Sequence, residues 1–265
     1  MIDKSQAIPA RVSIEIPNEV SSAAREHPYP LLFATVSGAH LYGFASADSD
    51  WDLRGVHVLP AQEVVGLLPL EETIELARNE AIELDLVTHD VRKFFTLLLR
   101  PNGYVLEQLT SPIIVRTTPE HAELKQLVPQ LLTRFHAHHY IGFAKNQWEL
   151  FCKEAQPRVK PLLYTFRVLL TGIHLMREHT IEANLGTLNE VYRLPFIPEL
   201  MQRKILGAER ETLSPDEVQK YEAEFLKLLE RLHADAAKTS LPEAPTARPA
   251  LNDLLIRLRL HGFTA

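Results

Sequence analysis

Two aspartates separated by one residue are the part of the sequence best suited to chemistry. Asp50 and Asp52 flank Trp51, and Leu53 and Arg54 follow. Successive side chains of a strand point to opposite faces, so we expect Asp50, Asp52 and Arg54 on one face and the apolar residues on the other. Two carboxylates this close repel each other, and a cation between them is the simplest physical reason to place them together.

The elements before and after this pair suggest how it is positioned. Residues 31–36 form a continuous apolar run that ends at Ser37-Gly38, which predicts a buried strand followed by a turn. The paired strand should then run over 51–59. Residues 73–77 and 82–88 alternate polar and apolar side chains, which predicts a hairpin. Asp85 lies on its second strand and is a candidate third carboxylate.

Helical patterns dominate the rest of the chain. A helix is predicted over 91–99 with Thr88 or Asp90 as its cap, a short one over 104–109, and an edge strand over 111–115. Thr118 caps a further helix that begins with Pro119. From there strand signals vanish, and 3.6-residue periodicity predicts helices over 131–155, 159–178, 197–208 and 215–237.

These patterns predict an α/β (α+β) fold, in which a small mixed sheet with flanking helices precedes an all-helical C-terminal domain. With 265 residues, 46% of them hydrophobic, the chain can hold one large domain or two small ones. We expect a lead-in over 1–30, a catalytic domain over 31–117 and a helical substrate-binding domain over 118–239. Residues 240–265 should form a Pro-rich linker and a short terminal helix.

The amino-acid composition argues against several classes of protein. The formal net charge of −6 argues against a surface that attracts nucleic acid everywhere, although a local basic face stays open. Cys152 is the single cysteine and cannot form an internal disulfide, which favours a reducing compartment. The first residues lack a secretory pattern and no apolar run approaches a membrane span, so we expect a cytoplasmic protein without a membrane partner. Its oligomeric state is left open.

The spacing of the glycine turn and the two aspartates is similar to a known signature. Gly38-Ala39, ten further residues and then Asp50-Trp51-Asp52 resemble the DNA polymerase β-like nucleotidyltransferase superfamily. More narrowly, residues 37–56 resemble the RNA repair pathway polymerase β family (RlaP), and the likeness covers most of 31–190. That family usually has serine at the position of Ala39.

The resemblance implies a two-metal reaction. Asp50, Asp52 and Asp85 would be the catalytic residues and would hold two Mg²⁺ ions, for which Mn²⁺ could substitute, with Asp85 completing the ion that activates the attacking hydroxyl. Gly38 would let the backbone approach the nucleotide phosphates. The nucleotide-binding residues that the resemblance implies are Ser37, Gly38, Ala39, Tyr42, Ser49, Arg54, Lys160, Tyr164 and Arg167.

Several of these residues have a second, purely structural interpretation. Arg54 could contact a phosphate or pair with Asp52, Tyr42 could stack on a base or pack in the core, and Ser49 could simply form a turn. Lys160, Tyr164 and Arg167 recur at i, i+4 and i+7, so they share a helix face that binds phosphates or is merely solvated.

Other charged residues are less distinctive. The spacing of His136, His138 and His139 disfavours zinc, because 138 turns away from the other two and no cysteine accompanies them. Further candidates for contacts to an RNA backbone are Arg203, Lys204, Arg257 and Arg259.

The resemblance and the motif together predict a Mg²⁺-dependent nucleotidyltransferase. It would move a nucleoside monophosphate from an NTP to a hydroxyl acceptor, an end of tRNA or of broken RNA. Two alternatives stay open. The acceptor could be a protein or a small molecule, or the chain could bind nucleotide or RNA without catalysis, an alternative motivated by Ala39.

Overall fold

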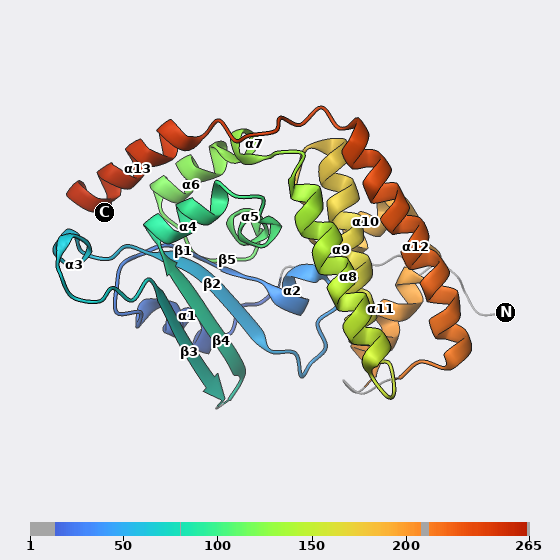
Figure 1. Ribbon diagram of the computed structural model, residues 1–265. Coiled ribbons are helices and arrows are strands. Elements are labelled where there is room, and N and C mark those ends of the chain that lie inside the picture. Colours follow the sequence, from blue (N-terminus) through green and yellow to red (C-terminus); the bar gives the residue numbers. More distant parts are fainter. Residues whose placement is uncertain (1–13, 80, 208–211, 264–265) are drawn as a thin grey trace.

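Five strands form one mixed sheet in the computed structural model, which describes residues 14–79, 81–207 and 212–263 (Figure 1). The strand order is β3-β4-β2-β1-β5. β2 and β4 run parallel, and the other neighbours are antiparallel. The strands are β1 (Leu31–Val36), β2 (Trp51–His57), β3 (Thr73–Asn79), β4 (Glu83–Asp90) and β5 (Ile114–Arg116). The predicted mixed sheet, the hairpin and the edge strand are confirmed.

Both faces of the sheet are covered, which explains the apolar character of β1. On one face α1 (Asn18–Arg25) packs a small core that includes Trp51 and Leu53 of β2. The opposite face joins a larger core with α4 (Val91–Leu98) and α5 (Gly103–Thr110). The alternation of β2 therefore works as predicted, because its apolar residues pack against α1 and Asp52 and Arg54 point to the other side.

Short helices and their caps connect the strands. α2 (Gly38–Tyr42) and α3 (Ala61–Val65) follow β1 and β2. Asp90 caps α4 by accepting a hydrogen bond from the Arg92 backbone N–H, and Thr118 caps α6 (Pro119–Gln126) in the same way from His121. α7 (Val128–Leu131) follows α6. The sequence signals for these helix starts are confirmed.

Five helices, α8 to α12, form the helical half of the molecule, which lies beside α2 in Figure 1. α9 is its centre and is buried along most of its length. The predicted start at residue 131 is wrong, because Leu132 is extended and the helix begins at His136. The sequence also missed α10, and residue 208 lies outside the described residues. The helices are α8 (His136–Lys153), α9 (Val159–Glu178), α10 (Leu185–Tyr192), α11 (Ile197–Leu206) and α12 (Pro215–Lys238).

The last helix, α13 (Arg248–His261), returns to the sheet and packs on α4 (Figure 1). The Arg259 guanidinium contacts both carboxylate oxygens of Asp90, at 2.5 and 2.7 Å, and donates to the Leu59 carbonyl. Arg257 pairs with Glu123. Both α13 arginines that were candidates for RNA contacts therefore have carboxylate partners within the chain.

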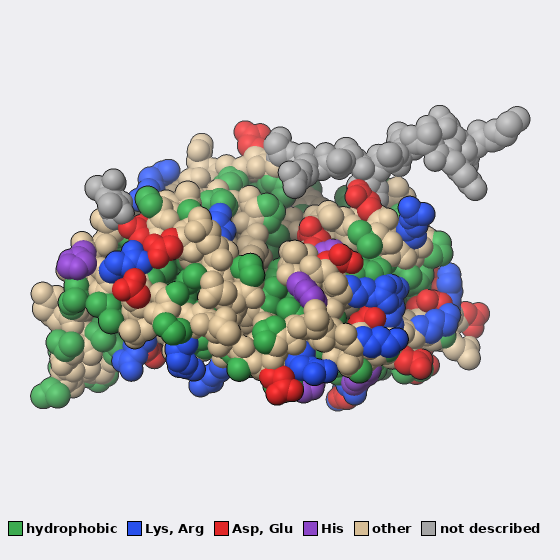
Figure 2. Space-filling view, turned by 90° about the horizontal axis from the view of Figure 1, so that it is seen from above, with side chains coloured by type: hydrophobic (Ala, Val, Ile, Leu, Met, Phe, Trp, Pro, Cys, Tyr) green, Lys and Arg blue, Asp and Glu red, His purple; other side chains and the backbone are tan. Residues whose placement is uncertain are grey.

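The surface carries mixed charge. On the face seen in Figure 2, lysine and arginine side chains over the helical half alternate with acidic ones instead of forming one continuous basic area. In the described part of the chain, no helix has the length and apolar character needed to cross a lipid bilayer.

Candidate active site

Asp52 and Asp85 lie side by side on the two parallel strands at the centre of the site. The register of β2 and β4 pairs Asp52 directly with Asp85. Because residues paired in this way point to the same face, both carboxylates project on the side that faces α5 and the helical half. Asp50 lies just before β2, close enough for its charge to raise the pKa of Asp52.

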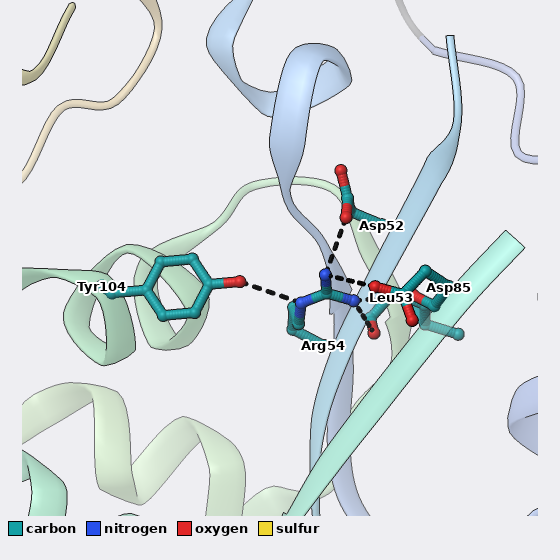
Figure 3. A network of polar contacts seen from close by, with 5 residues as sticks. All are labelled: Asp52, Leu53, Arg54, Asp85 and Tyr104. Atoms are coloured by element: carbon teal, nitrogen blue, oxygen red, sulfur yellow. Dashed lines mark hydrogen bonds and ion pairs between the residues drawn. The ribbon is translucent and has the colours of Figure 1, made fainter. Parts of the chain in front are cut away.

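Arg54 occupies the space between the two carboxylates (Figure 3). Its Nη2 atom lies 2.7 Å from Asp52 Oδ1 and 2.8 Å from Asp85 Oδ2. Nη1 donates to the carbonyls of Leu53 and Asp85, and Nε donates to the Tyr104 hydroxyl at 2.9 Å. The repulsion between the carboxylates is thus offset by a side chain of the same strand, and the structural interpretation of Arg54 as a partner of Asp52 is the one observed.

The environment of Asp52 affects its protonation. Burial raises the pKa of Asp52 above its ordinary value, and the charges of Asp85 and Asp50 raise it further. Arg54 and, more weakly, Lys160 act in the opposite direction. Asp52 is therefore a carboxylate whose negative charge is only partly compensated, which favours an additional cation at this position.

Gly38 brings the backbone against the same carboxylate. It has φ +61°, a conformation that glycine adopts readily, and a Cβ atom on it would lie 1.8 Å from Asp52 Oδ2. The backbone N–H of Ser37 donates to the Asp52 carbonyl at 2.8 Å. A side chain at position 38 would collide with the Asp52 carboxylate, so glycine is required there for Asp52 to take its observed position. Ala39 packs into the large core and is 5% exposed.

A cavity of about 230 Å³ opens next to Asp52 and Gly38. Its walls carry aromatic side chains from α5, α8 and α9. Three buried polar atoms among the described residues that line it lack a hydrogen bond of ordinary geometry: Ser37 Oγ, Tyr140 Oη and Arg167 Nε. The lining residues are Ser37, Gly38, Tyr42, Asp52, Tyr104, Glu107, His139, Tyr140, Phe143, Tyr164, Arg167 and Val168.

An ion pair forms the inner end of this cavity. Arg167 Nη1 lies 2.7 Å from Glu107 Oε2, and the two side chains are 4% and 2% exposed. The Arg167 guanidinium also stacks on the Tyr42 ring, 3.8 Å from its centroid. Burial lowers the pKa of Arg167, but Glu107 outweighs this and holds it above the ordinary value. The predicted phosphate ligand Arg167 is thus a buried cation with a partner in the chain.

The remaining predicted residues lie around this cavity or near its mouth. Tyr42 packs edge-to-face on Tyr164, and burial raises the pKa of Tyr164 to about 12. Lys160 is on the first turn of α9, where its charge lowers the pKa of Asp52. Ser49 uses its hydroxyl within a turn, accepting from the Ser46 backbone N–H at 3.0 Å.

The donor set suits Mg²⁺ chemically, since carboxylate oxygens are its preferred protein ligands. Asp52 lines the cavity and its side chain is 29% exposed, so this carboxylate is accessible to a ligand. Across residues 14–79, 81–207 and 212–263, however, no three histidine, cysteine or acidic side chains are close enough to hold one ion. The residues fit a divalent ion bound by Asp52 and Asp85, with Asp50 at the mouth.

Sequence reasoning missed six residues of the cavity, one of them the apolar Val168 of α9. Glu107 had a usable signal, because it is a single carboxylate in an otherwise apolar helix. The other four have no motif, and only the packing of α5 and α8 against the sheet brings them together. They are Tyr104, His139, Tyr140 and Phe143.

Comparison with known proteins places this geometry in context. A family model described as "RNA repair pathway DNA polymerase beta family" matches residues 12–257. An uncharacterized protein of Methanocaldococcus jannaschii is 30% identical over 143 residues, which cover 54% of this chain and 58% of the relative. The uncharacterized protein YcgL of Bacillus subtilis is 25% identical over 198 residues, 74% of this chain and 73% of YcgL.

One solved structure also aligns with this chain. It is a nucleotidyltransferase-like protein from Exiguobacterium sibiricum, 14% identical, with a TM-score of 0.31. The alignment covers 92% of this chain and 74% of the other.

Proposed function

The chain belongs to the RNA repair pathway DNA polymerase beta family, and from this we propose that it transfers a nucleoside monophosphate from an NTP to a hydroxyl group at an RNA end. One observation carries the proposal. Asp52 is paired in register with Asp85 on the parallel strand β4, and it lies directly against Gly38 and lines a cavity of about 230 Å³. Phosphoryl transfer depends mainly on alignment and charge neutralisation, which such an arrangement can provide.

The carboxylates are the proposed metal ligands. Asp52 and Asp85, with Asp50, would hold Mg²⁺, which when bound supplies charge neutralisation at the transferred phosphoryl group. Before any ligand binds, Arg54 keeps Asp52 and Asp85 close together in one orientation by contacting both. The absence of a Cβ at Gly38 leaves the space that Asp52 Oδ2 occupies against the turn.

The cavity is the proposed site of the nucleotide's planar part. Aromatic rings such as Tyr104, Phe143 and Tyr164 can pack against a base, and the buried Tyr140 hydroxyl and Arg167 Nε can donate to its polar edge. Lys160, whose charge acts on Asp52, lies where it can neutralise a phosphate.

The direct test is a transfer assay. The full chain is incubated with each α-labelled NTP, Mg²⁺ and either tRNA or nicked RNA, and labelled product is measured on a denaturing gel. We expect label to enter nuclease-sensitive product with wild type and not with Asp52→Asn. If wild type transfers label from none of the NTPs to either RNA, the proposal is contradicted. If the labelled product resists nuclease, the acceptor is a protein or a small molecule.

Binding without catalysis is the second candidate, and two observations favour it. Arg54 already occupies the space between Asp52 and Asp85, and Ala39 places a methyl group in the core where the family pattern has a hydroxyl. Calorimetry separates the two candidates. Tight NTP binding in the presence of Mg²⁺ or Mn²⁺ without any turnover supports the binding protein, whereas turnover rules it out.

A further inference from the structure

Lys204 is a buried lysine that links the helical half to the catalytic strands. It lies on α11 and is 3% exposed. Its ammonium group donates to the hydroxyls of Ser46 and Ser49, the latter at 2.9 Å. Burying an ammonium group costs free energy unless it is hydrogen-bonded, so the contacts to the two serines help to keep Lys204 in the interior. The structure therefore places Lys204 inside the molecule and not on an RNA-binding surface.

The two serines belong to a closed turn over residues 46–49, here called the serine turn. The Ser49 backbone N–H donates to the Ser46 carbonyl at 3.0 Å, and the Ser49 hydroxyl accepts from the Ser46 backbone N–H at the same distance. The Ser46 hydroxyl donates to Asp48 at 2.6 Å. The chain enters β2 one residue later, with Asp50 between the turn and the strand.

The preceding segment is held from the same side. Gly43 ends α2 with φ +85°, and a Cβ on it would lie 2.6 Å from Asn184 Nδ2. Asn184 caps α10 and donates to the Leu41 carbonyl at 3.4 Å. Residues 44–50 contain no helix or strand, so side-chain contacts hold them: the buried Phe44 in the large core, His40 at the Ser49 carbonyl, and these contacts with α10 and α11.

We propose that Lys204 is a positioning residue, which through Ser46 and Ser49 fixes Asp50 relative to Asp52 and Asp85. The inference deepens the proposed function, since it assigns part of the catalytic geometry to the helical half. Asp50 itself is not part of the sheet and has no strand partner to fix it. His40 contacts the residues on either side of Asp50, Ser49 and Trp51, and the Lys204 contacts, one residue away, add a constraint from the helical half.

Hydrogen exchange tests this inference without any assay of activity. We expect Lys204→Met, in the full chain, to speed amide exchange of the peptide 45–50 at least about tenfold, because a charged hydrogen-bond donor is lost. Arg203→Met is the matched control, since it removes the neighbouring cation of α11, which pairs with Glu217 inside the helical half. Unchanged exchange in the 45–50 peptide of Lys204→Met overturns the proposal.

Kinetics distinguish positioning from a general loss of stability. We expect Lys204→Met to lower kcat about tenfold with KM for the NTP unchanged. Lys227→Met, which removes a lysine of α12 that pairs with Glu224, should leave both constants at wild-type values. Ser49→Ala is the milder variant if Lys204→Met does not fold, and it should change both readouts in the same direction. Combining Ser49→Ala with Lys204→Met should add little, and a fully additive double variant contradicts the route through Ser49.

The outcome separates this inference from the proposed function. If wild type transfers no nucleotide but Lys204→Met still loosens the 45–50 peptide, the proposed function fails and the positioning of Asp50 stands. If wild type transfers nucleotide and Lys204→Met changes neither exchange nor kcat, the positioning role fails and the proposed function stands.

Discussion

Two arginines hold carboxylates in different environments, Arg167 in the wall of the cavity and Arg54 beside the lining residues Asp52 and Tyr104. Arg54 contacts Asp52 and Asp85, whose side chains are 29% and 49% exposed, whereas the partner of Arg167 is Glu107, which is 2% exposed. Burial lowers the pKa of each arginine, but its neighbours outweigh this and hold the pKa above the ordinary value, so both are cations.

The ion pairs of the two arginines differ in whether the carboxylate can exchange its arginine for another cation. A partly solvated carboxylate can leave one cation for another at little cost, because water and ligands reach it. A fully buried pair cannot, since separating it leaves an uncompensated charge in the interior. We therefore infer that Asp52 and Asp85 can exchange Arg54 for another cation, whereas the Arg167–Glu107 pair stays intact and leaves Arg167 Nε for a ligand.

The largest expected effect is on catalysis at the exposed pair. Asp52→Asn should lower transfer at least about 1,000-fold, roughly 4 kcal/mol in activation free energy, because the residue loses its charge and its affinity for a cation. The melting temperature should stay within a few degrees of wild type. Steady-state transfer and thermal melts measure the two quantities, and a variant that retains transfer removes Asp52 from the chemistry.

At the buried pair the main loss should be in stability. Arg167→Met leaves the Glu107 carboxylate buried without its cation, and we expect the free energy of unfolding to fall by about 3–5 kcal/mol. Adding Glu107→Gln should restore part of this loss, because the unpaired charge is removed. Urea denaturation at pH 7 measures both variants. A loss in Arg167→Met that is no larger than the loss in Arg54→Met would contradict the comparison.

Replacing the exposed arginine should have a smaller effect on stability. Arg54→Met should lower the free energy of unfolding by about 2 kcal/mol, since several charged hydrogen bonds are lost but water can solvate the carboxylates. Arg54 lowers the pKa of Asp52, so its removal should move the acid limb of the transfer rate to higher pH. Urea denaturation and a pH–rate profile test this, and an acid limb that moves to lower pH contradicts it.

The smallest effect is a pH dependence that neither arginine causes. Burial lowers the pKa of His136 from 6.5 to about 4, so the unfolded chain takes up a proton below pH 6.5 that the folded chain does not. The contribution of neutral His136 to the free energy of unfolding is therefore fully present above pH 6.5 and is lost as the pH falls toward 4. Between pH 6.5 and 5.5 this histidine should cost about 1 kcal/mol, measured as the difference between wild type and His136→Gln. If the difference in the free energy of unfolding between wild type and His136→Gln does not change with pH, protonation of His136 does not contribute to the pH dependence of stability.

The sequence was most informative where the pattern was local. Alternation along 51–57 and 82–88 assigned Asp52 and Asp85 to exposed strand faces, and the hairpin was predicted from the same signal. Helix starts at Asp90 and Thr118 followed from capping residues. These features depend on neighbours in the chain, so one sequence is enough to predict them.

Contacts between distant elements were beyond sequence reasoning. Glu107 and Arg167 are 60 residues apart, and Lys204 lies 155 residues after Ser49. Nothing in the helical periodicity of α11 predicts that one lysine of a basic pair faces inward, because that depends on how the helix packs. The helix face of Lys160, Tyr164 and Arg167 was identified, but the buried partner Glu107 was not. The sequence therefore did not show that Arg167 differs from the other two in being a buried, paired cation.

The contact between Arg259 and Asp90 has a consequence for synthesis. The two residues are separated by 169 positions, and Asp90 is a fully buried carboxylate at the start of α4. At roughly 5–20 residues per second, a ribosome needs on the order of 10–30 s to produce the second partner after the first. During that interval the nascent sheet carries a carboxylate that cannot yet be buried at low cost, so docking of α13 is expected to be a late event that completes folding only when nearly all of the chain has been made.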